Sequence, residues 1–138
     1  MTTEKNKSIV RAYHTELWEN GDLTSVDRHW SPDAKVEITD FDSSAVDAIH
    51  DDVKRYWSAF NEVKTEILAL IAEDDKVVLH WQTSGYHFGP YGDVAPTNKR
   101  ITMAGMDILR IENDLIVECT SMWDGMSVYD QLGVLNIG

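Results

Sequence analysis

Three side chains that can transfer protons, His87, Asp107 and Asp124, lie in or directly after apolar segments in the second half of the chain. Side chains alternate between the two faces of a strand, so the parity of a residue number assigns it to a face. The three residues fall at in-phase positions on predicted neighbouring strands, which predicts that they share one face of the sheet. In a water-poor cavity the pKa of a carboxyl group rises, because burial disfavours its charged form, and such a group suits general acid–base catalysis.

Each of these residues also has a structural interpretation. Asp124 precedes a short predicted helix, and aspartate is a favoured N-terminal cap of helices. Asp107 could form a structural ion pair with Arg110 or Lys99, and from the sequence we slightly favour this interpretation over a catalytic role. His87 precedes the one loop rich in Gly and Pro, and it could be a hydrogen-bonded residue of the cavity rim.

Hydrophobic periodicity predicts the elements that position these residues. In the first part of the chain apolar residues recur at helical spacing, which indicates helices over residues 8–18, 23–30 and 45–60. Between the second and the third helix, the alternating residues 35–39 indicate a strand and the polar residues 40–44 indicate a loop. The acidic side chains within that loop are expected to be solvated.

The hydrophobic period changes from about 3.6 to 2 in the second half of the chain. This change predicts four strands, over residues 63–72, 77–88, 99–111 and 115–123, followed by a helical turn over 127–132. Helices followed by long antiparallel strands indicate an α+β fold. No linker or internal repeat interrupts the pattern, so residues 1–138 are expected to form a single domain.

The charge of the chain argues against several classes of partner. Its formal net charge is −12, with 12 Lys and Arg against 24 Asp and Glu. Nucleic acids and anionic membranes attract basic surfaces, so we expect neither as a partner. No segment approaches the roughly 20 consecutive apolar residues that cross a bilayer, and the polar N-terminus does not resemble a signal peptide. With a lone cysteine, Cys119, and no zinc-binding spacing, we expect no metal site and a cytoplasmic location.

Several segments of the second half together form a family pattern. They are IAEDDKVVLHW at 71–81, GYHFG at 85–89, PTNKR at 96–100, GMDILRI at 105–111, and Asp124 ahead of QLG at 131–133. This pattern resembles the SnoaL-like polyketide cyclases of the nuclear transport factor two-like superfamily. The resemblance implies a cone-shaped, curved sheet covered by N-terminal helices, a SnoaL-like or cystatin-like α+β barrel, with the cone open at one end.

The resemblance also implies a reaction and a site. Asp124 would correspond to the general acid–base residue of the family, with Asp107 and His87 assisting, and the reaction would be an aldol cyclisation or an isomerisation without a cofactor. The guest would be a small hydrophobic or polycyclic molecule. Thr120 stands where many relatives carry a bulky aromatic residue, and this departure would widen the cavity or change its specificity. The residues expected to line the pocket are Tyr13, Trp57, Trp81, Met103, Thr120 and Met122.

Two other functions fit the same fold. One is a non-catalytic ligand-binding or dimerisation module, in which two copies pair through the outward face of the sheet as a homodimer or a higher homo-oligomer. An enzyme should contain a buried carboxylate or histidine without a permanent charge partner, whereas a binding module should not. The other is an epoxide hydrolase or dehydratase. An epoxide hydrolase needs two carboxylates bridged by an arginine, and Arg110 has the wrong parity relative to Asp107 for that role.

Overall fold

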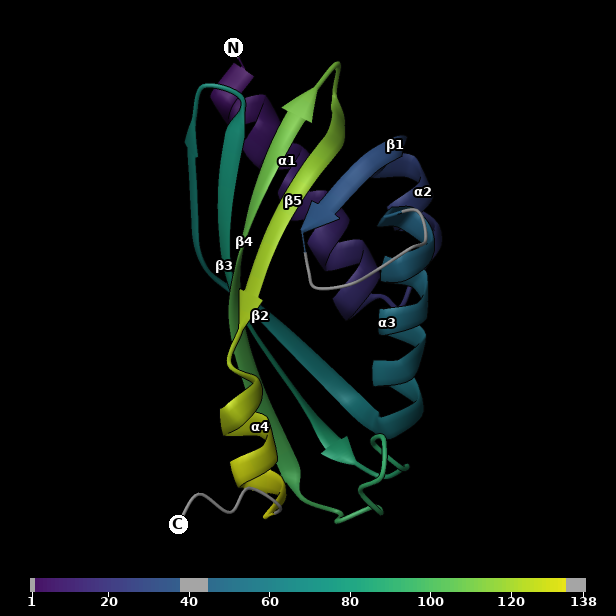
Figure 1. The fold of residues 1–138 in the computed structure, drawn as a ribbon. Coiled ribbons are helices and arrows are strands. Elements are labelled where there is room, and N and C mark those ends of the chain that lie inside the picture. Colours follow the sequence, from purple (N-terminus) through teal and green to yellow (C-terminus); the bar gives the residue numbers. More distant parts are fainter. Residues whose placement is uncertain (1, 38–44, 134–138) are drawn as a thin grey trace.

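A computed structural model describes residues 2–37 and 45–133, and it has the mixed α+β fold that the sequence predicts (Figure 1). The loop expected at 40–44 lies outside the described residues. The three N-terminal helices all lie on one side of a curved sheet, and the last helix lies at the end of the sheet near the C-terminus (Figure 1).

The N-terminal part contains three helices, a short π-helix and one strand: α1 (Thr2–His14), η1 (Thr15–Glu19), α2 (Thr24–His29), β1 (Trp30–Glu37) and α3 (Ala45–Ala59). Strand β1 begins earlier than the sequence predicted and includes Pro32. Proline has no backbone N–H to donate to a neighbouring strand, and β1 tolerates it because it is an edge strand of the sheet.

The C-terminal part contains the four predicted long strands and a closing helix: β2 (Phe60–Glu73), β3 (Lys76–His87), β4 (Arg100–Glu112), β5 (Leu115–Trp123) and α4 (Gly125–Leu132). The sheet order is β1-β5-β4-β3-β2, in which β2 to β5 pair antiparallel and β1 pairs parallel with β5. The tight turns β2–β3 and β4–β5 use left-handed residues, Asp74 and the pair Asn113 and Asp114, as is common for Asp and Asn.

The core lies between helix α1 and the concave face of the sheet. Val10 and Leu17 of the helical segment are fully buried there, as are Leu79 of β3 and Leu109 of β4. Burial of each such side chain stabilises the fold by about 1.5–3 kcal/mol. A second, smaller cluster occupies the other end of the sheet and contains Tyr56, Ala59, Phe60, Ile101, Val128 and Leu132. Between the two clusters the sheet and helices enclose a space that the apolar core does not fill.

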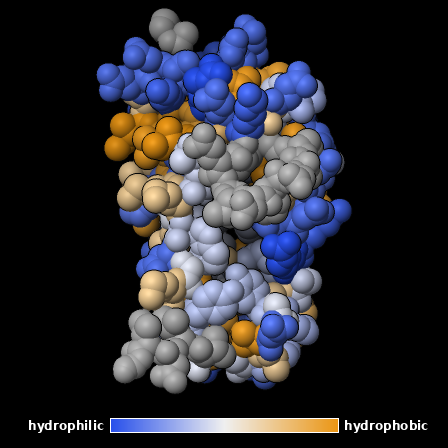
Figure 2. Space-filling model, in the orientation of Figure 1, coloured by the Kyte–Doolittle hydropathy of each residue, from blue (hydrophilic) through white to orange (hydrophobic). Residues whose placement is uncertain are grey.

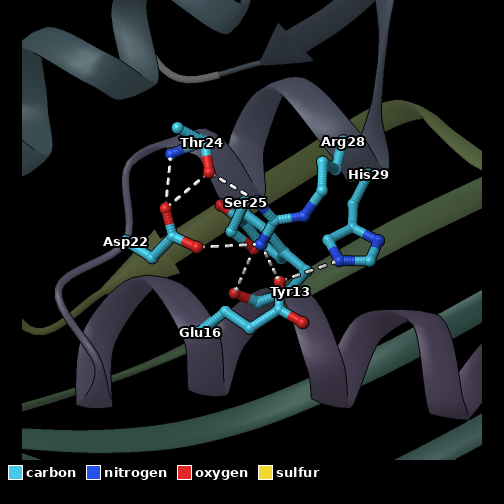
Figure 3. A network of polar contacts seen from close by, with 7 residues as sticks. All are labelled: Tyr13, Glu16, Asp22, Thr24, Ser25, Arg28 and His29. Carbon is cyan, nitrogen blue, oxygen red and sulfur yellow. Dashed lines mark hydrogen bonds and ion pairs between the residues drawn. The ribbon is translucent and has the colours of Figure 1, made fainter.

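A polar network joins η1 to helix α2 (Figure 3). The Arg28 guanidinium donates to Glu16 at 2.6 Å and to Asp22 at 2.9 Å. Asp22 also accepts from the backbone N–H of Thr24 at 3.0 Å, which stabilises the start of α2. These side chains are partly exposed to water, which weakens the attraction between their charges. Their consequence is geometric, because they hold the π-helical turn that carries Trp18 against α2.

The convex face of the sheet is open. Two rows of uncharged side chains cross β3, β4 and β5 there; one row is Val78, Ile108 and Thr120, and the other is His80, Met106 and Met122. Met106, Ile108 and Met122 are exposed. In Figure 2 hydrophobic side chains (orange) reach the surface at the left edge of the view, on the side of the sheet, while hydrophilic residues (blue) cover the end near the N-terminus.

Among the described residues, no helix combines the length and the apolar character needed to cross a membrane.

Candidate active site

A cavity of about 200 Å³ lies between the helical segments and the concave face of the sheet. The described residues that line it come from η1, helix α3, strands β3 to β5 and the loop after β3. They are Trp18, Asp52, Arg55, Tyr56, Trp81, Tyr91, Met103, Ser121 and Trp123. The predicted lining residues Trp81 and Met103 are therefore among them.

Helix α3 contributes three lining residues because of its periodicity. Asp52, Arg55 and Tyr56 are separated by three and four positions, which places them on one face of the helix. Arg55 donates to the Asp52 carboxylate at 3.1 Å, and both side chains are well exposed. Partial burial raises the pKa of Asp52. The cavity thus has a polar, self-neutralised pair at this part of its wall.

Asp107 of β4 lies directly behind the wall of this cavity. The Ser121 hydroxyl of β5 donates to the Asp107 carboxylate at 2.6 Å, and the Trp81 indole N–H of β3 donates to it as well. Both donors line the cavity, so the carboxyl group lies within one hydrogen bond of the cavity wall. Asp107 retains some accessible surface. Burial nevertheless raises its pKa, and the two hydrogen bonds oppose this rise only in part.

Asp107 forms no ion pair with Arg110 or Lys99, so the structural interpretation that we favoured from the sequence is wrong. The Arg110 guanidinium donates to Glu118 at 3.0 Å and to Glu112 at 3.1 Å, on the opposite face of β4. Lys99 donates instead to the backbone carbonyl of Gln131 at 3.4 Å. Among the described residues, none of the Lys and Arg side chains is buried. Asp107 is therefore a carboxyl group held by neutral donors alone.

Two further proton-bearing groups lie near Asp107. Burial raises the pKa of the Tyr13 hydroxyl and of the Cys119 thiol, and the charge of Asp107 raises both further. Both groups therefore stay protonated at neutral pH. Because the thiolate and not the thiol is the reactive form of cysteine, Cys119 is not a nucleophile in this environment.

Gly105 allows Trp81 to reach Asp107. The two residues are paired across β3 and β4, and the indole ring of Trp81 lies over the Gly105 backbone. A Cβ atom at position 105 would lie 2.5 Å from Trp81 Cζ2 and 2.6 Å from the carbonyl oxygen of Met122. Any larger residue would push the indole away, so only glycine allows the Trp81 ring to lie this close to the backbone of β4.

Asp124 does not face the cavity, contrary to our expectation. It is exposed directly after β5 and caps helix α4, where its side chain accepts from the backbone N–H of Ser127 at 3.0 Å. The physical reason is a bulge in β5: Arg110 pairs with Glu118 but Ile111 pairs with Ile116, so Val117 is an extra residue. After the bulge, the odd-numbered residues of β5 face the concave side and the even-numbered residues face the convex side, the reverse of the predicted assignment.

The same bulge corrects the predicted positions of Thr120 and Met122. Both are exposed on the convex face, and Met122 retains 75% of its accessible surface. The small side chain of Thr120 therefore does not widen the cavity. Cys119, Ser121 and Trp123, which the sequence placed on the other face of β5, are the residues directed towards the core and the cavity.

His87 lies far from Asp107. It is completely buried near the end of β3, where its Nδ1 accepts from the backbone N–H of Thr97 at 3.1 Å. Asp107 pairs with Leu79, which precedes His87 on the same strand by a distance of roughly 26 Å at about 3.3 Å per residue. Burial lowers the pKa of His87, which favours the neutral ring. His87 fixes the loop after β3, so the structure does not place it where it could assist Asp107.

The two remaining predicted lining residues belong to the core. Tyr13 is buried against Trp30, with 5.7 Å between ring centroids, and Trp57 packs against both hydrophobic clusters. Neither lines the cavity. The lining residues that the sequence did not single out are Asp52, Arg55, Tyr56, Tyr91, Ser121 and Trp123. The helical spacing on α3 is a signal that could have found three of them, whereas the β5 bulge concealed Ser121 and Trp123.

Within residues 2–37 and 45–133, no group of three or more His, Cys, Asp or Glu side chains is arranged to hold a metal ion.

Comparisons with known proteins agree with this architecture. The family model of the SnoaL-like polyketide cyclases matches residues 7–132. Among solved structures, AclR, a putative hydroxylase from Streptomyces galilaeus, is 24% identical with a TM-score of 0.88, over 99% of this chain and 89% of that chain. IdmH, a putative polyketide cyclase from Streptomyces antibioticus, is 19% identical with a TM-score of 0.81, over 94% of this chain and 99% of that chain. These likenesses show the fold. A search of curated proteins found no match.

Proposed function

Because the chain belongs to the SnoaL-like polyketide cyclase family, we propose that it is an enzyme that transfers protons to and from carbon in a small organic guest. Asp107 is the general acid–base residue of this proposal. The observation that carries it is a half-buried carboxyl group with neutral hydrogen-bond donors and, among the described residues, no cation beside it, one hydrogen bond from a cavity. A purely binding module has no need of such a group, because an uncompensated buried carboxyl is costly to the fold.

The chemistry follows from the position of this carboxyl group. The Ser121 hydroxyl, which lines the cavity, takes the proton of a C–H bond beside a carbonyl and passes its own proton to the Asp107 carboxylate, while the electron pair of the C–H bond moves onto the carbonyl oxygen to give an enolate. In an aldol cyclisation the enolate carbon then forms a bond to a second carbonyl carbon of the same guest. The alkoxide that results takes a proton from Ser121, which recovers its own proton from Asp107. Ser121 and Trp81 hold the carboxyl group in place throughout.

The raised pKa of Asp107 makes it a better base than an exposed aspartate. A general base works best when its pKa lies near the working pH, and burial moves the pKa of Asp107 in that direction. Arg110 does not bridge Asp107 to a second carboxylate, because it is bound to Glu112 and Glu118. The arrangement therefore favours proton transfer over the hydrolysis of an epoxide.

An exchange experiment tests this proposal without the natural substrate. The probe is 2-tetralone, a two-ring ketone with acidic C–H bonds beside its carbonyl, incubated in deuterium oxide and followed by proton NMR. We expect the protein to accelerate exchange of these protons, and Asp107→Asn to reduce the acceleration by about 10²–10⁴-fold. Asp124→Asn is the matched control, because Asn is also a good N-cap and the residue is exposed. A folded Asp107→Asn protein that exchanges at the unaltered rate would contradict the proposal.

We also propose that two copies associate through the convex face of the sheet. The two uncharged rows on β3 to β5 support this, because a chain with a net charge of −12 repels its copies elsewhere on its surface. Sedimentation velocity tests it: Ile108→Glu should shift a dimer to monomer, and a wild-type monomer at all concentrations would contradict it.

The cytoplasmic location expected from the sequence stays a prediction.

A further inference from the structure

Within residues 2–37 and 45–133, the interior around the cavity contains a carboxyl group but no cation. All Lys and Arg side chains lie in the described part of the chain, and none is buried. Burial lowers the pKa of His14 to about 4 and lowers that of His87 as well, so both buried imidazoles are neutral at pH 7. Arg55 is the only cation among the described lining residues, and it is paired with Asp52. The charge of ionised Asp107 therefore has no counter-charge among the residues that the structure describes.

The lining itself offers aromatic rings. Five of the described lining residues are aromatic, and three of them are tryptophans: Trp18, Tyr56, Trp81, Tyr91 and Trp123. The face of an aromatic ring carries partial negative charge and attracts cations, with tryptophan the strongest. Trp18 and Tyr56 contact each other edge to face, with 5.4 Å between their centroids, so they form one continuous aromatic wall.

The overall charge of the chain is negative, like the charge of Asp107 and the partial charge on the faces of the aromatic rings. Its formal net charge of −12 gives a negative potential that raises the local concentration of cations and lowers that of anions. Inside a cavity walled by apolar groups this potential is screened less than at the surface. The local carboxyl group, the aromatic wall and the overall charge thus all favour the same sign of guest.

We propose that the natural guest of this cavity is an organic cation, a flat conjugated molecule that carries a quaternary or protonated nitrogen. The nitrogen lies against the tryptophan rings, and its charge compensates Asp107. This inference rests on the proposed function for the role of Asp107 in proton transfer, and it names the class of substrate. A cationic nitrogen conjugated with the reacting carbon also accepts the electron pair when the C–H bond breaks: the proton passes to the Ser121 hydroxyl, which passes its own proton to the Asp107 carboxylate, and the cation becomes a neutral enamine.

Three probes of similar shape test the sign of the charge that the cavity prefers. They are 1-methylquinolinium as the cation, 1-naphthalenemethanol as the neutral compound and 1-naphthoate as the anion, each titrated by calorimetry above neutral pH. We expect the cation to bind at least about tenfold more tightly than the alcohol, and the anion to bind most weakly. Tighter binding of the alcohol or the anion, or binding of none of the three, would overturn the proposal.

Variants separate this inference from the proposed function. In Asp107→Asn the cation should lose its advantage over the alcohol, while the affinity for the alcohol stays within about twofold and shows that the cavity is intact. Asp124→Asn should keep the full preference, because that residue lies on the convex face. A cation preference that survives in Asp107→Asn would contradict the inference. These probes are unreactive, so their binding does not depend on catalysis. Loss of the cation preference with normal 2-tetralone exchange would contradict the inference alone. A cation preference without 2-tetralone exchange would contradict the proposed function alone.

Discussion

The concave and convex faces of strands β4 and β5 differ more than the residue types on them suggest. On the convex face Arg110 is bound by Glu112 and Glu118 in water, and Asp124 caps a helix. On the concave face Asp107 is held only by a hydroxyl and an indole. Carboxyl groups occur on both faces, but Asp124 on the convex face is exposed, whereas Asp107 on the concave face is half-buried and has no cation beside it among the described residues. The environment of an aspartate therefore decides its chemistry, and a shift of one residue along a strand decides its environment.

The energetic contrast between the faces can be measured on two neighbouring residues of β4. Leu109 is fully buried on the concave face, whereas Ile108 retains 46% of its accessible surface on the convex face. We expect Leu109→Ala to lower the free energy of unfolding by about 2–5 kcal/mol, because it leaves a cavity in the core. Ile108→Ala should change it by about 0.5 kcal/mol or less at protein concentrations that keep copies apart. Denaturant titration measures both, and similar losses in the two variants would contradict the assignment of faces.

A pH titration of stability sharpens the contrast at a buried histidine. A hydrogen bond of 2.7 Å joins Nε2 of His14 to the hydroxyl oxygen of Thr65. Burial lowers the pKa of His14 from 6.5 to about 4. Between these values the unfolded chain binds a proton that the folded chain does not, so stability falls as the pH falls. We expect a loss of up to roughly 3 kcal/mol over this window. His14→Gln should remove most of the loss, and His80→Gln on the convex face should leave it in place. An equal acid loss in both variants would exclude His14 as its source.

Gly105 tests how closely the cavity wall is packed around Asp107. Gly105→Ala introduces a Cβ 2.5 Å from the Trp81 ring, so we expect a loss of about 1–3 kcal/mol in the free energy of unfolding and slower 2-tetralone exchange. Gly125→Ala is the control, because its Cβ would meet only the Trp123 side chain, at 3.2 Å or more. Thermal unfolding and the exchange assay measure both variants. An unaltered exchange rate in Gly105→Ala would show that the indole is not needed to position Asp107.

The sequence predicted the elements well because their hydrophobic periods are regular. All four long strands and the helix α3 lie where the alternation and the helical spacing indicated. The parity of β3 and β4 was also correct, so Asp107, Trp81 and Met103 could be placed on the concave face. Parity is reliable along a strand for as long as its pairing is continuous.

The sequence could not predict the site where that continuity fails. No residue type marks the bulge at Val117, and it moved Ser121 and Trp123 inward and Thr120 and Met122 outward. The ion pairs of Arg110 were likewise hidden, since they depend on which strand neighbours are close in space. The spacing within each strand does not give the register between β3 and β4, which pairs Asp107 with Leu79 and so separates it from His87. The candidate with the strongest family likeness, Asp124, therefore proved to be a helix cap.

The proposed function depends on Asp107 being a half-buried carboxyl group that has no cation beside it among the described residues. The most direct test is a carbon-13 NMR titration of the aspartate carboxyl groups, with the Asp107 signal assigned by its loss in Asp107→Asn. We predict that the pKa of Asp107 lies above the ordinary value of 3.8, because burial outweighs its hydrogen bonds to Ser121 and Trp81. A pKa at or below 3.8 would show that water or a cation stabilises the charge, and would contradict the account.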